Sequence, residues 1–184
     1  MELQQAKQIA DGLVKDLLQF CERAEIAGSI RREKPEVKDI EIVAVPKLLP
    51  LTDMFGASVG TSSAIEENIQ SLLASWNAYT IKNGEKYKMI ALADHGIKLD
   101  LFIVTKESWG VQFVIRTGPS DFSHWLVTQK RFGGAMPAHA KVEGGRIIVA
   151  NKPIETNEEI DVFNFLQIRM QEPKLRSAPK NFIK

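Results

Sequence analysis

Residues 28–45 read GSIRREKPEVKDIEIVAV, and this stretch holds the strongest evidence on the fold. Its second half, Asp39–Val45, is rich in β-branched residues and is followed by Pro46, a pattern typical of a strand that stops at the proline. Its first half opens on Gly28-Ser29, which predicts a turn, and continues as a charged loop. The stretch therefore predicts a turn followed, eleven residues after Gly28, by a strand that starts with acidic residues.

Acidic residues of two predicted strands can meet on one sheet. Asp39 and Glu41 are separated by one residue, so on a strand both side chains point to the same face, roughly 7 Å apart. Asp100 lies inside a second predicted strand, within the apolar run Ile97–Phe102. If the two strands are neighbours, three carboxylates converge, and a hard divalent cation such as Mg²⁺ relieves their repulsion. Two such ions about 4 Å apart can clamp the attacking and leaving oxygens of an in-line displacement.

Plainer interpretations of the same residues remain open. The alternation of polar and apolar residues at 39–42 is also typical of a strand with one face in water. Lys98 stands two residues before Asp100 and offers that carboxylate a structural partner. The Gly-Ser turn and the paired arginines after it, Arg31 and Arg32, offer backbone N–H groups, a hydroxyl and guanidinium groups to a phosphate. The same residues can equally form a plain turn followed by a solvated charged stretch.

The rest of the chain alternates predicted helices with predicted strands. Residues 46–64 hold two prolines and two glycines and predict a long, mobile connection. Hairpin turns are expected at Asn83-Gly84 and His95-Gly96. The expected helices are 3–24, a helix capped by Ser63 and running to about Trp76, 106–116, 119–131, and 158–166 opened by Thr156 or Asn157. The further expected strands are 79–81, 86–93, 97–104 and short strands within 139–149.

The composition is that of an ordinary globular protein. The 184 residues include 24 Lys+Arg and 23 Asp+Glu, a net charge of +1 that excludes whole-chain basicity as the basis of nucleic-acid binding. The single cysteine, Cys21, excludes an internal disulfide and is expected to be a small buried hydrophobe. No apolar run approaches the roughly 20 residues that cross a bilayer, and the N-terminus lacks the pattern of a signal peptide. We therefore expect a soluble cytoplasmic protein.

These motifs, taken in order, resemble the nucleotidyltransferase signature of the X family of DNA polymerases. The likeness rests first on GSIRR at 28–32 followed by DIE at 39–41. NGEKYK at 83–88 resembles the hairpin that leads to the family's third acidic strand, KLDLF at 98–102 resembles that strand, and RTGP at 116–119 resembles the family's Thr-Gly turn. Residues 156–176 resemble the end of the thumb-like subdomain, so the likeness covers nearly the whole chain.

The resemblance implies a role for each matching residue. Asp39, Glu41 and Asp100 would hold two Mg²⁺ ions, for which Mn²⁺ could substitute, and Asp100 would activate the primer 3′-hydroxyl. The implied nucleotide-binding residues are Gly28, Ser29, Arg32, Thr117 and Gly118. The chain departs from the family at Glu41, where Asp is usual, and at Ile115-Arg116, where an aromatic pair is usual.

The fold that the resemblance implies is α+β. Residues 1–116 would form a nucleotidyltransferase palm, a mixed β-sheet flanked by helices, and residues 117–184 would form a small α+β thumb-like lobe. The family's N-terminal lyase and helix-hairpin-helix modules have no room in these 184 residues. A minimal palm-plus-thumb enzyme is therefore expected.

The implied activity is that of a small gap-filling DNA repair polymerase. It would add a nucleoside monophosphate from a nucleoside triphosphate to the 3′-hydroxyl of primed or gapped DNA, acting as a monomer and without a membrane partner. Phosphate contacts are expected from Lys130, Arg131, Lys174 and Arg176, with Lys180 and Lys184 of the tail, although the tail can also be a solvated terminus. Trp125 is expected in the core.

Two alternatives to this activity remain open. The first changes the acceptor, because the same kind of site can transfer a nucleotide to RNA, to a small molecule or to a protein. The second is a non-catalytic nucleotide- or nucleic-acid-binding module. The thumb-like C-terminal stretch favours DNA, whereas the small net charge favours another acceptor.

Overall fold

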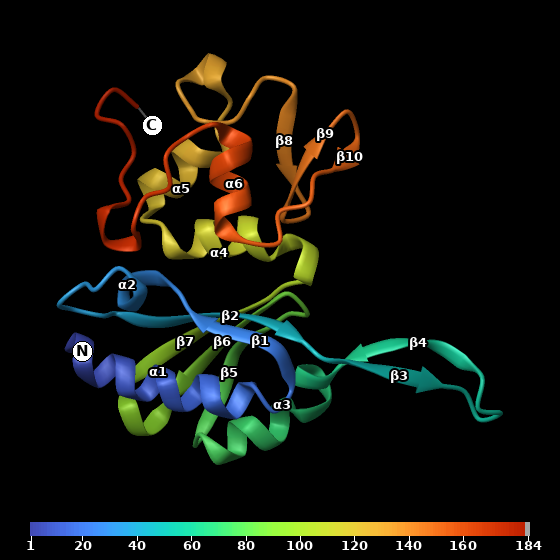
Figure 1. Ribbon diagram of the computed structural model, residues 1–184. Coiled ribbons are helices and arrows are strands. Elements are labelled where there is room, and N and C mark those ends of the chain that lie inside the picture. The colour runs from blue at the N-terminus through green and yellow to red at the C-terminus, as the bar shows by residue number, and fades with distance from the viewer. Residues whose placement is uncertain (183–184) are drawn as a thin grey trace. The chain divides into compact units, whose positions relative to one another are not determined.

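The computed structural model describes residues 1–182, and these form two compact units (Figure 1). Unit 1 comprises Met1–Ile26 and Glu36–Ile103. Unit 2 comprises Ala27–Pro35 and the described residues from Val104 onward. The expected division after residue 116 differs from these units, because helix α4 (Trp109–Thr117) packs against helix α6 (Glu159–Leu166) and so belongs to unit 2. None of the helices among residues 1–182 has the length and apolarity that crossing a membrane requires.

Unit 1 is built on a five-stranded mixed sheet. The strand order is β1-β2-β7-β6-β5, with parallel pairing only between β2 and β7. The strands span Cys21–Ile26 (β1), Asp39–Pro46 (β2), Ala78–Asn83 (β5), Tyr87–Leu92 (β6) and Ile97–Ile103 (β7). The expected strands in these regions and the expected mixed sheet are confirmed.

Helices α1 (Leu3–Leu17) and α3 (Ala64–Ser75) cover one face of this sheet (Figure 1). Helix α1 buries Ala6, Ala10, Leu13 and Leu17, a spacing that places all four on one stripe of the helix. Helix α3 begins after Ser63 at its N-cap and ends before Trp76, as the sequence predicts. Because side chains alternate along a strand, burial of Ile40 and Ile42 of β2 leaves Asp39 and Glu41 on the opposite face.

The single helix expected over residues 3–24 is wrong in its last third. Helix α1 ends at Leu17, and residues 21–26 form strand β1, which pairs antiparallel with β2 from Cys21 to Ile26. This pairing satisfies the backbone of β1 through a partner that lies distant in sequence, which a local helical pattern does not reveal. Cys21 is buried as expected, and burial raises the pKa of its thiol to about 12 against the opposing charge of Lys47.

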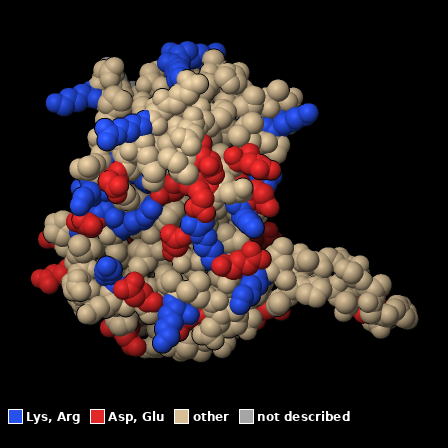
Figure 2. Space-filling model, viewed as in Figure 1, with Lys and Arg blue, Asp and Glu red and all other residues tan. Residues whose placement is uncertain are grey.

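Residues 48–63 form a hairpin, here called the arm, instead of the expected mobile connection. Strands β3 (Leu48–Thr52) and β4 (Ser58–Ser63) pair only with each other. The Asp53 carboxylate accepts the backbone N–H groups of Phe55 and Ala57 at 2.9 Å each, which fixes the turn. Met54 and Phe55 at this turn are 89% and 88% exposed. Figure 2 shows the arm extending from the surface of unit 1 without any basic side chain.

Unit 2 combines short helices with a small sheet. Its sheet has the order β10-β9-β8, with the turn Gly144-Gly145 between β8 and β9 as expected. Trp125 is buried in the core of this unit, as predicted, with Phe122, Phe163 and Leu166. The helices are α2 (Gly28–Arg31), α4, α5 (Ser120–Val127), α6 and the 3₁₀ turns Lys106–Ser108, Lys130–Phe132 and Pro173–Leu175; the strands are β8 (Ala140–Glu143), β9 (Arg146–Val149) and β10 (Lys152–Pro153).

Two expected helix boundaries in unit 2 are wrong. Helix α5 ends at Val127, four residues before the expected end, and residues 130–132 form a separate 3₁₀ turn. Helix α6 is capped by Glu158 instead of Thr156 or Asn157, in a capping box with Asp161. The capping side chain is thus the Glu158 carboxylate, and not the Thr156 hydroxyl or the Asn157 amide that the sequence also offered.

Candidate functional site

Three carboxylates share one face of the unit 1 sheet, and we call Asp39, Glu41 and Asp100 the carboxylate face. In the parallel pairing of β2 with β7, Glu41 stands opposite Asp100 and Asp39 stands opposite Lys98. Paired residues of neighbouring strands point to the same side of a sheet, and Asp39 lies two residues before Glu41 on the same strand. The strand adjacency on which the sequence prediction depended is therefore present.

Asp100 is held by a tyrosine that the sequence interpretation did not use. The Tyr87 hydroxyl of β6 donates a hydrogen bond to Asp100 Oδ1 at 2.7 Å. The ring of Tyr87 stacks on Phe102, with ring centroids 5.2 Å apart. Asp100 is thus bound by Tyr87, whereas Lys98, the partner that the sequence offered, is exposed.

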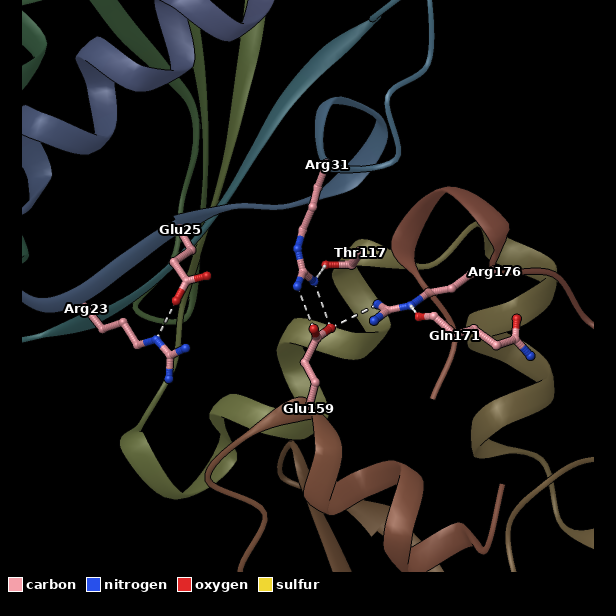
Figure 3. A network of polar contacts seen from close by, with 7 residues as sticks. All are labelled: Arg23, Glu25, Arg31, Thr117, Glu159, Gln171 and Arg176. Atoms are coloured by element: carbon pink, nitrogen blue, oxygen red, sulfur yellow. Dashed lines mark hydrogen bonds and ion pairs between the residues drawn. The ribbon is translucent and has the colours of Figure 1, made fainter. Parts of the chain in front are cut away.

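A fourth carboxylate lies beside these three and is already paired. Glu25 of β1 stands opposite Val43, which shares a face of β2 with Glu41. The Arg23 guanidinium donates to Glu25 Oε1 at 2.7 Å (Figure 3). Its negative charge is therefore locally balanced, and Glu25 is not counted among the candidate metal ligands.

Whether the carboxylate face suits a metal ion depends on the ligand atoms that it offers. Among residues 1–182, no group of three or more His, Cys, Asp or Glu side chains already stands close enough together to hold a metal ion. Neighbouring carboxylates repel one another when no cation lies between them. The backbone register nevertheless places three oxygen-donor side chains on adjacent strands, and hard divalent cations prefer such ligands.

The Gly-Ser turn of unit 2 presents an unsatisfied hydroxyl. Gly28 opens helix α2 with φ of +60°, a left-handed conformation that favours glycine at this position. Ser29 Oγ is buried and has no hydrogen-bond partner within the described part of the chain. Arg32 donates to the backbone carbonyl of Thr117 at 2.7 Å. A buried hydroxyl without a partner is unfavourable unless another group binds it, so Ser29 fits a role in binding a ligand oxygen.

The two arginines of the turn differ in what they contact. Arg31 forms two hydrogen bonds to the Glu159 carboxylate at 2.8 and 2.6 Å, donates to Thr117 Oγ1 at 2.8 Å, and lies over the Phe113 ring (Figure 3). The bidentate bond to Glu159 commits the Arg31 guanidinium to a contact within unit 2. Of the pair, Arg32 is therefore the arginine that we retain as a candidate triphosphate ligand.

Glu159 is an organising residue that sequence reasoning missed. Burial disfavours its charged form, but hydrogen bonds from Arg31 and Arg176, together with their charges, outweigh burial and lower the pKa of Glu159. In the sequence, Glu159 stands in an acidic run at a helix start, which is adequately explained by capping and the helix dipole. No local signal distinguishes it from Glu158 beside it.

The expectation that Arg176 forms part of an exposed phosphate-contacting surface is wrong. Its side chain is 0% exposed, and its guanidinium donates to Glu159 at 2.9 Å and to the Gln171 carbonyl at 3.2 Å. Lys130, Arg131 and Lys174 are exposed, and Lys174 Nζ lies 3.5 Å from Glu33 Oε2. Lys180 is exposed, and Lys184 lies outside the described residues. The candidate DNA contacts are thereby reduced to the exposed lysines and Arg131.

The Thr-Gly turn is closely packed in unit 2. Thr117 is fully buried and binds Arg31 through its hydroxyl and Arg32 through its carbonyl. A Cβ at Gly118 would lie 2.6 Å from Phe122 Cδ1 and 2.8 Å from Ser123 Oγ, so the glycine is needed for the close approach of α5. The predicted contacts of Thr117 and Gly118 with a nucleotide remain predictions.

Comparison with protein-family models and with curated proteins assigns no family to the chain. No protein-family model matches the chain, and no curated protein matches it.

Proposed function

We propose that the protein is a metal-dependent nucleotidyltransferase that adds a nucleoside monophosphate from a triphosphate to a DNA 3′-hydroxyl. The observation that carries the proposal is the register of β2 and β7, which sets Glu41 opposite Asp100 and leaves Asp39 on the same face. Carboxylates that share one sheet face repel one another unless a cation lies among them, and hard divalent cations prefer such oxygen ligands.

The proposed reaction divides the work among residues of the chain. The acceptor 3′-oxygen forms a bond to the α-phosphorus, the bond from that phosphorus to the bridging oxygen breaks, and pyrophosphate leaves. Asp100 accepts the hydroxyl proton, and Asp39, Glu41 and Asp100 hold the cations. When bound, Mg²⁺ supplies the positive charge that stabilises the transferring phosphoryl group and the leaving group. Ser29 and Arg32 are proposed to donate to the triphosphate oxygens.

A labelled primer on gapped DNA tests the proposal most directly. We expect incubation with Mg²⁺ or Mn²⁺ and the four deoxynucleoside triphosphates, added one at a time, to extend the primer by one nucleotide. Chelation of the metal should abolish the extension. Absence of extension with every triphosphate and both metals would contradict DNA as the acceptor.

Another acceptor is the second candidate, and burial of Arg176 favours it. With net charge +1 and one predicted phosphate contact fewer, the chain offers little basic surface to a nucleic acid. Transfer of label from an α-labelled triphosphate to a hydroxyl-bearing small molecule or to a protein would identify this alternative.

Arg32→Ala is expected to weaken triphosphate binding. Loss of a hydrogen bond to a charged group costs about 1.5–3 kcal/mol, or roughly a 10- to 150-fold increase in Kd. Titration of the wild type and the variant with a non-hydrolysable triphosphate measures the difference. Lys34→Ala, which changes an exposed basic residue two positions away, is the control. Overlapping titrations of wild type and Arg32→Ala would leave the Gly-Ser turn without a nucleotide role.

DNA binding is expected to be weak and to fall steeply with salt. Each neutralised phosphate adds about 0.9 to the slope of log affinity against log salt on duplex DNA, so Lys130, Arg131 and Lys174 together predict a slope of about 3. Fluorescence anisotropy of gapped DNA at several salt concentrations measures the slope. Lys174→Ala should lower it by about 0.9, whereas Lys152→Ala, an exposed lysine outside the predicted contacts, should not change it. A flat salt response would remove DNA from the proposal.

A further inference from the structure

We infer that Tyr87 is a positioning residue that sets the orientation of the Asp100 carboxylate for cation binding. The inference rests on the proposed function, because it concerns a residue behind the proposed metal ligands. It adds to that function a residue of β6 that carries no charge.

The hydrogen bond between Tyr87 and Asp100 selects one carboxylate oxygen. The phenol donates to Oδ1 at 2.7 Å, the usual length of a strong O–H···O bond. Met89, and not Tyr87, stands directly opposite Asp100, so the hydroxyl reaches Asp100 diagonally across the strand pair. Because the two oxygens belong to one planar carboxylate, holding Oδ1 also fixes the direction of Oδ2, through which Asp100 is proposed to bind a cation.

The ring that carries this hydroxyl is itself fixed. Tyr87 stands opposite Phe102 in the β6–β7 ladder, and the two rings are stacked with an interplanar angle of 24°. Stacking on Phe102 restricts the side-chain rotation of Tyr87. The hydroxyl is therefore delivered to one position, as expected of a residue that orients a ligand.

The start of β6 is anchored from the other face of the sheet by the next residue. Lys88 is 0% exposed, and its ammonium contacts Glu66 Oε2 at 2.7 Å and Asn83 Oδ1 at 2.5 Å. Glu66 belongs to α3 and Asn83 ends β5, so Lys88 ties together three elements of unit 1. Because consecutive strand residues point to opposite faces, Lys88 holds the backbone from which Tyr87 reaches Asp100.

The expected effect of losing the hydroxyl is on metal affinity. Residues that orient metal ligands typically contribute 10- to 100-fold to affinity, because they fix the ligand rotamer before the metal binds. Tyr87→Phe keeps the ring and its stacking on Phe102 but removes the donor. We therefore expect Tyr87→Phe to bind Mn²⁺ about 10- to 100-fold more weakly than the wild type.

Titration with Mn²⁺ alone, followed by electron paramagnetic resonance and calorimetry, tests this inference. The chain has two tyrosines, so Tyr79→Phe, at an exposed position of β5, is the matched control. Asp100→Asn reports on the site itself. Thermal unfolding of each variant shows whether the fold is kept.

The outcomes separate this inference from the proposed function. Weaker Mn²⁺ binding by Tyr87→Phe and Asp100→Asn, with Tyr79→Phe like the wild type, is the expected result. If Asp100→Asn loses Mn²⁺ while Tyr87→Phe binds like the wild type, the positioning role is overturned and the metal site stands. If the wild type binds no Mn²⁺, or Asp100→Asn binds it unchanged, both are overturned.

Discussion

Asp100→Asn is expected to reduce nucleotidyl transfer by at least 10²- to 10⁴-fold, the typical contribution of a general base. Loss of a metal ligand adds to this effect. The variant should fold, because it removes one of three like charges that share a sheet face and keeps an oxygen that can accept the Tyr87 hydroxyl. Single-turnover transfer to gapped DNA measures the activity, and thermal unfolding without metal measures the stability.

The matched control for this variant is Asp11→Asn. Asp11 is an exposed carboxylate of α1, a helix of the same unit, and the substitution changes the net charge equally. We expect Asp11→Asn to transfer nucleotide at the wild-type rate. Transfer by Asp100→Asn at the same rate would exclude the carboxylate face from the chemistry.

Glu159→Gln is expected to lower the free energy of unfolding by about 3–5 kcal/mol, the cost of breaking a buried ion pair. Glu159 bonds to both Arg31 and Arg176, and the Arg176 side chain is fully buried, so the variant leaves a buried cation uncompensated. Urea unfolding at pH 7 measures the loss. Glu155→Gln, an exposed carboxylate four residues earlier, should change the free energy little.

The same ion pair predicts an acid-sensitive stability. The pKa of Glu159 is lower in the folded chain than the ordinary value of about 4.3 in the unfolded chain. Its contribution is therefore present above that value and is lost as the pH falls through the lower folded pKa. In Glu159→Gln this part of the acid sensitivity should disappear. An identical pH dependence in wild type and variant would contradict the assignment.

Those parts of the fold with a strong local signal could be predicted from sequence. Strand β2 is rich in β-branched residues, and β6 and β7 are preceded by the turns at Asn83-Gly84 and His95-Gly96; all three strands form as expected. Strand β1 could not be predicted, because its evidence is its pairing with β2. Pro50 and Gly60 disfavour strands, which is why the sequence did not predict the arm. In the structure Gly60 adopts φ of +145° next to an irregularity in the β3–β4 ladder, so the hairpin accommodates these residues.

The sequence singles out the acidic residues of the candidate site more clearly than its arginines. Asp39, Glu41 and Asp100 stand out because carboxylates interrupt apolar strands. Arg31 and Arg32 are adjacent and identical in type, and only the position of Glu159, far along the chain, separates their roles. Tyr87 gives no sequence signal, since its function as a hydrogen-bond donor depends on a diagonal contact across two strands.

The arm also offers a position at which a protease can cut the chain while the five-stranded sheet of unit 1 stays intact. Its backbone hydrogen bonds lie within the hairpin, and Phe55 at its turn is a preferred residue for a chymotrypsin-type protease. We expect brief digestion, followed by mass spectrometry, to show the first cleavage at Phe55. Asp39 and Glu41 would lie on one fragment and Asp100 on the other, joined by the parallel ladder of β2 and β7. The two fragments, produced separately, are therefore expected to complement each other, with nucleotidyl transfer restored only when both are mixed.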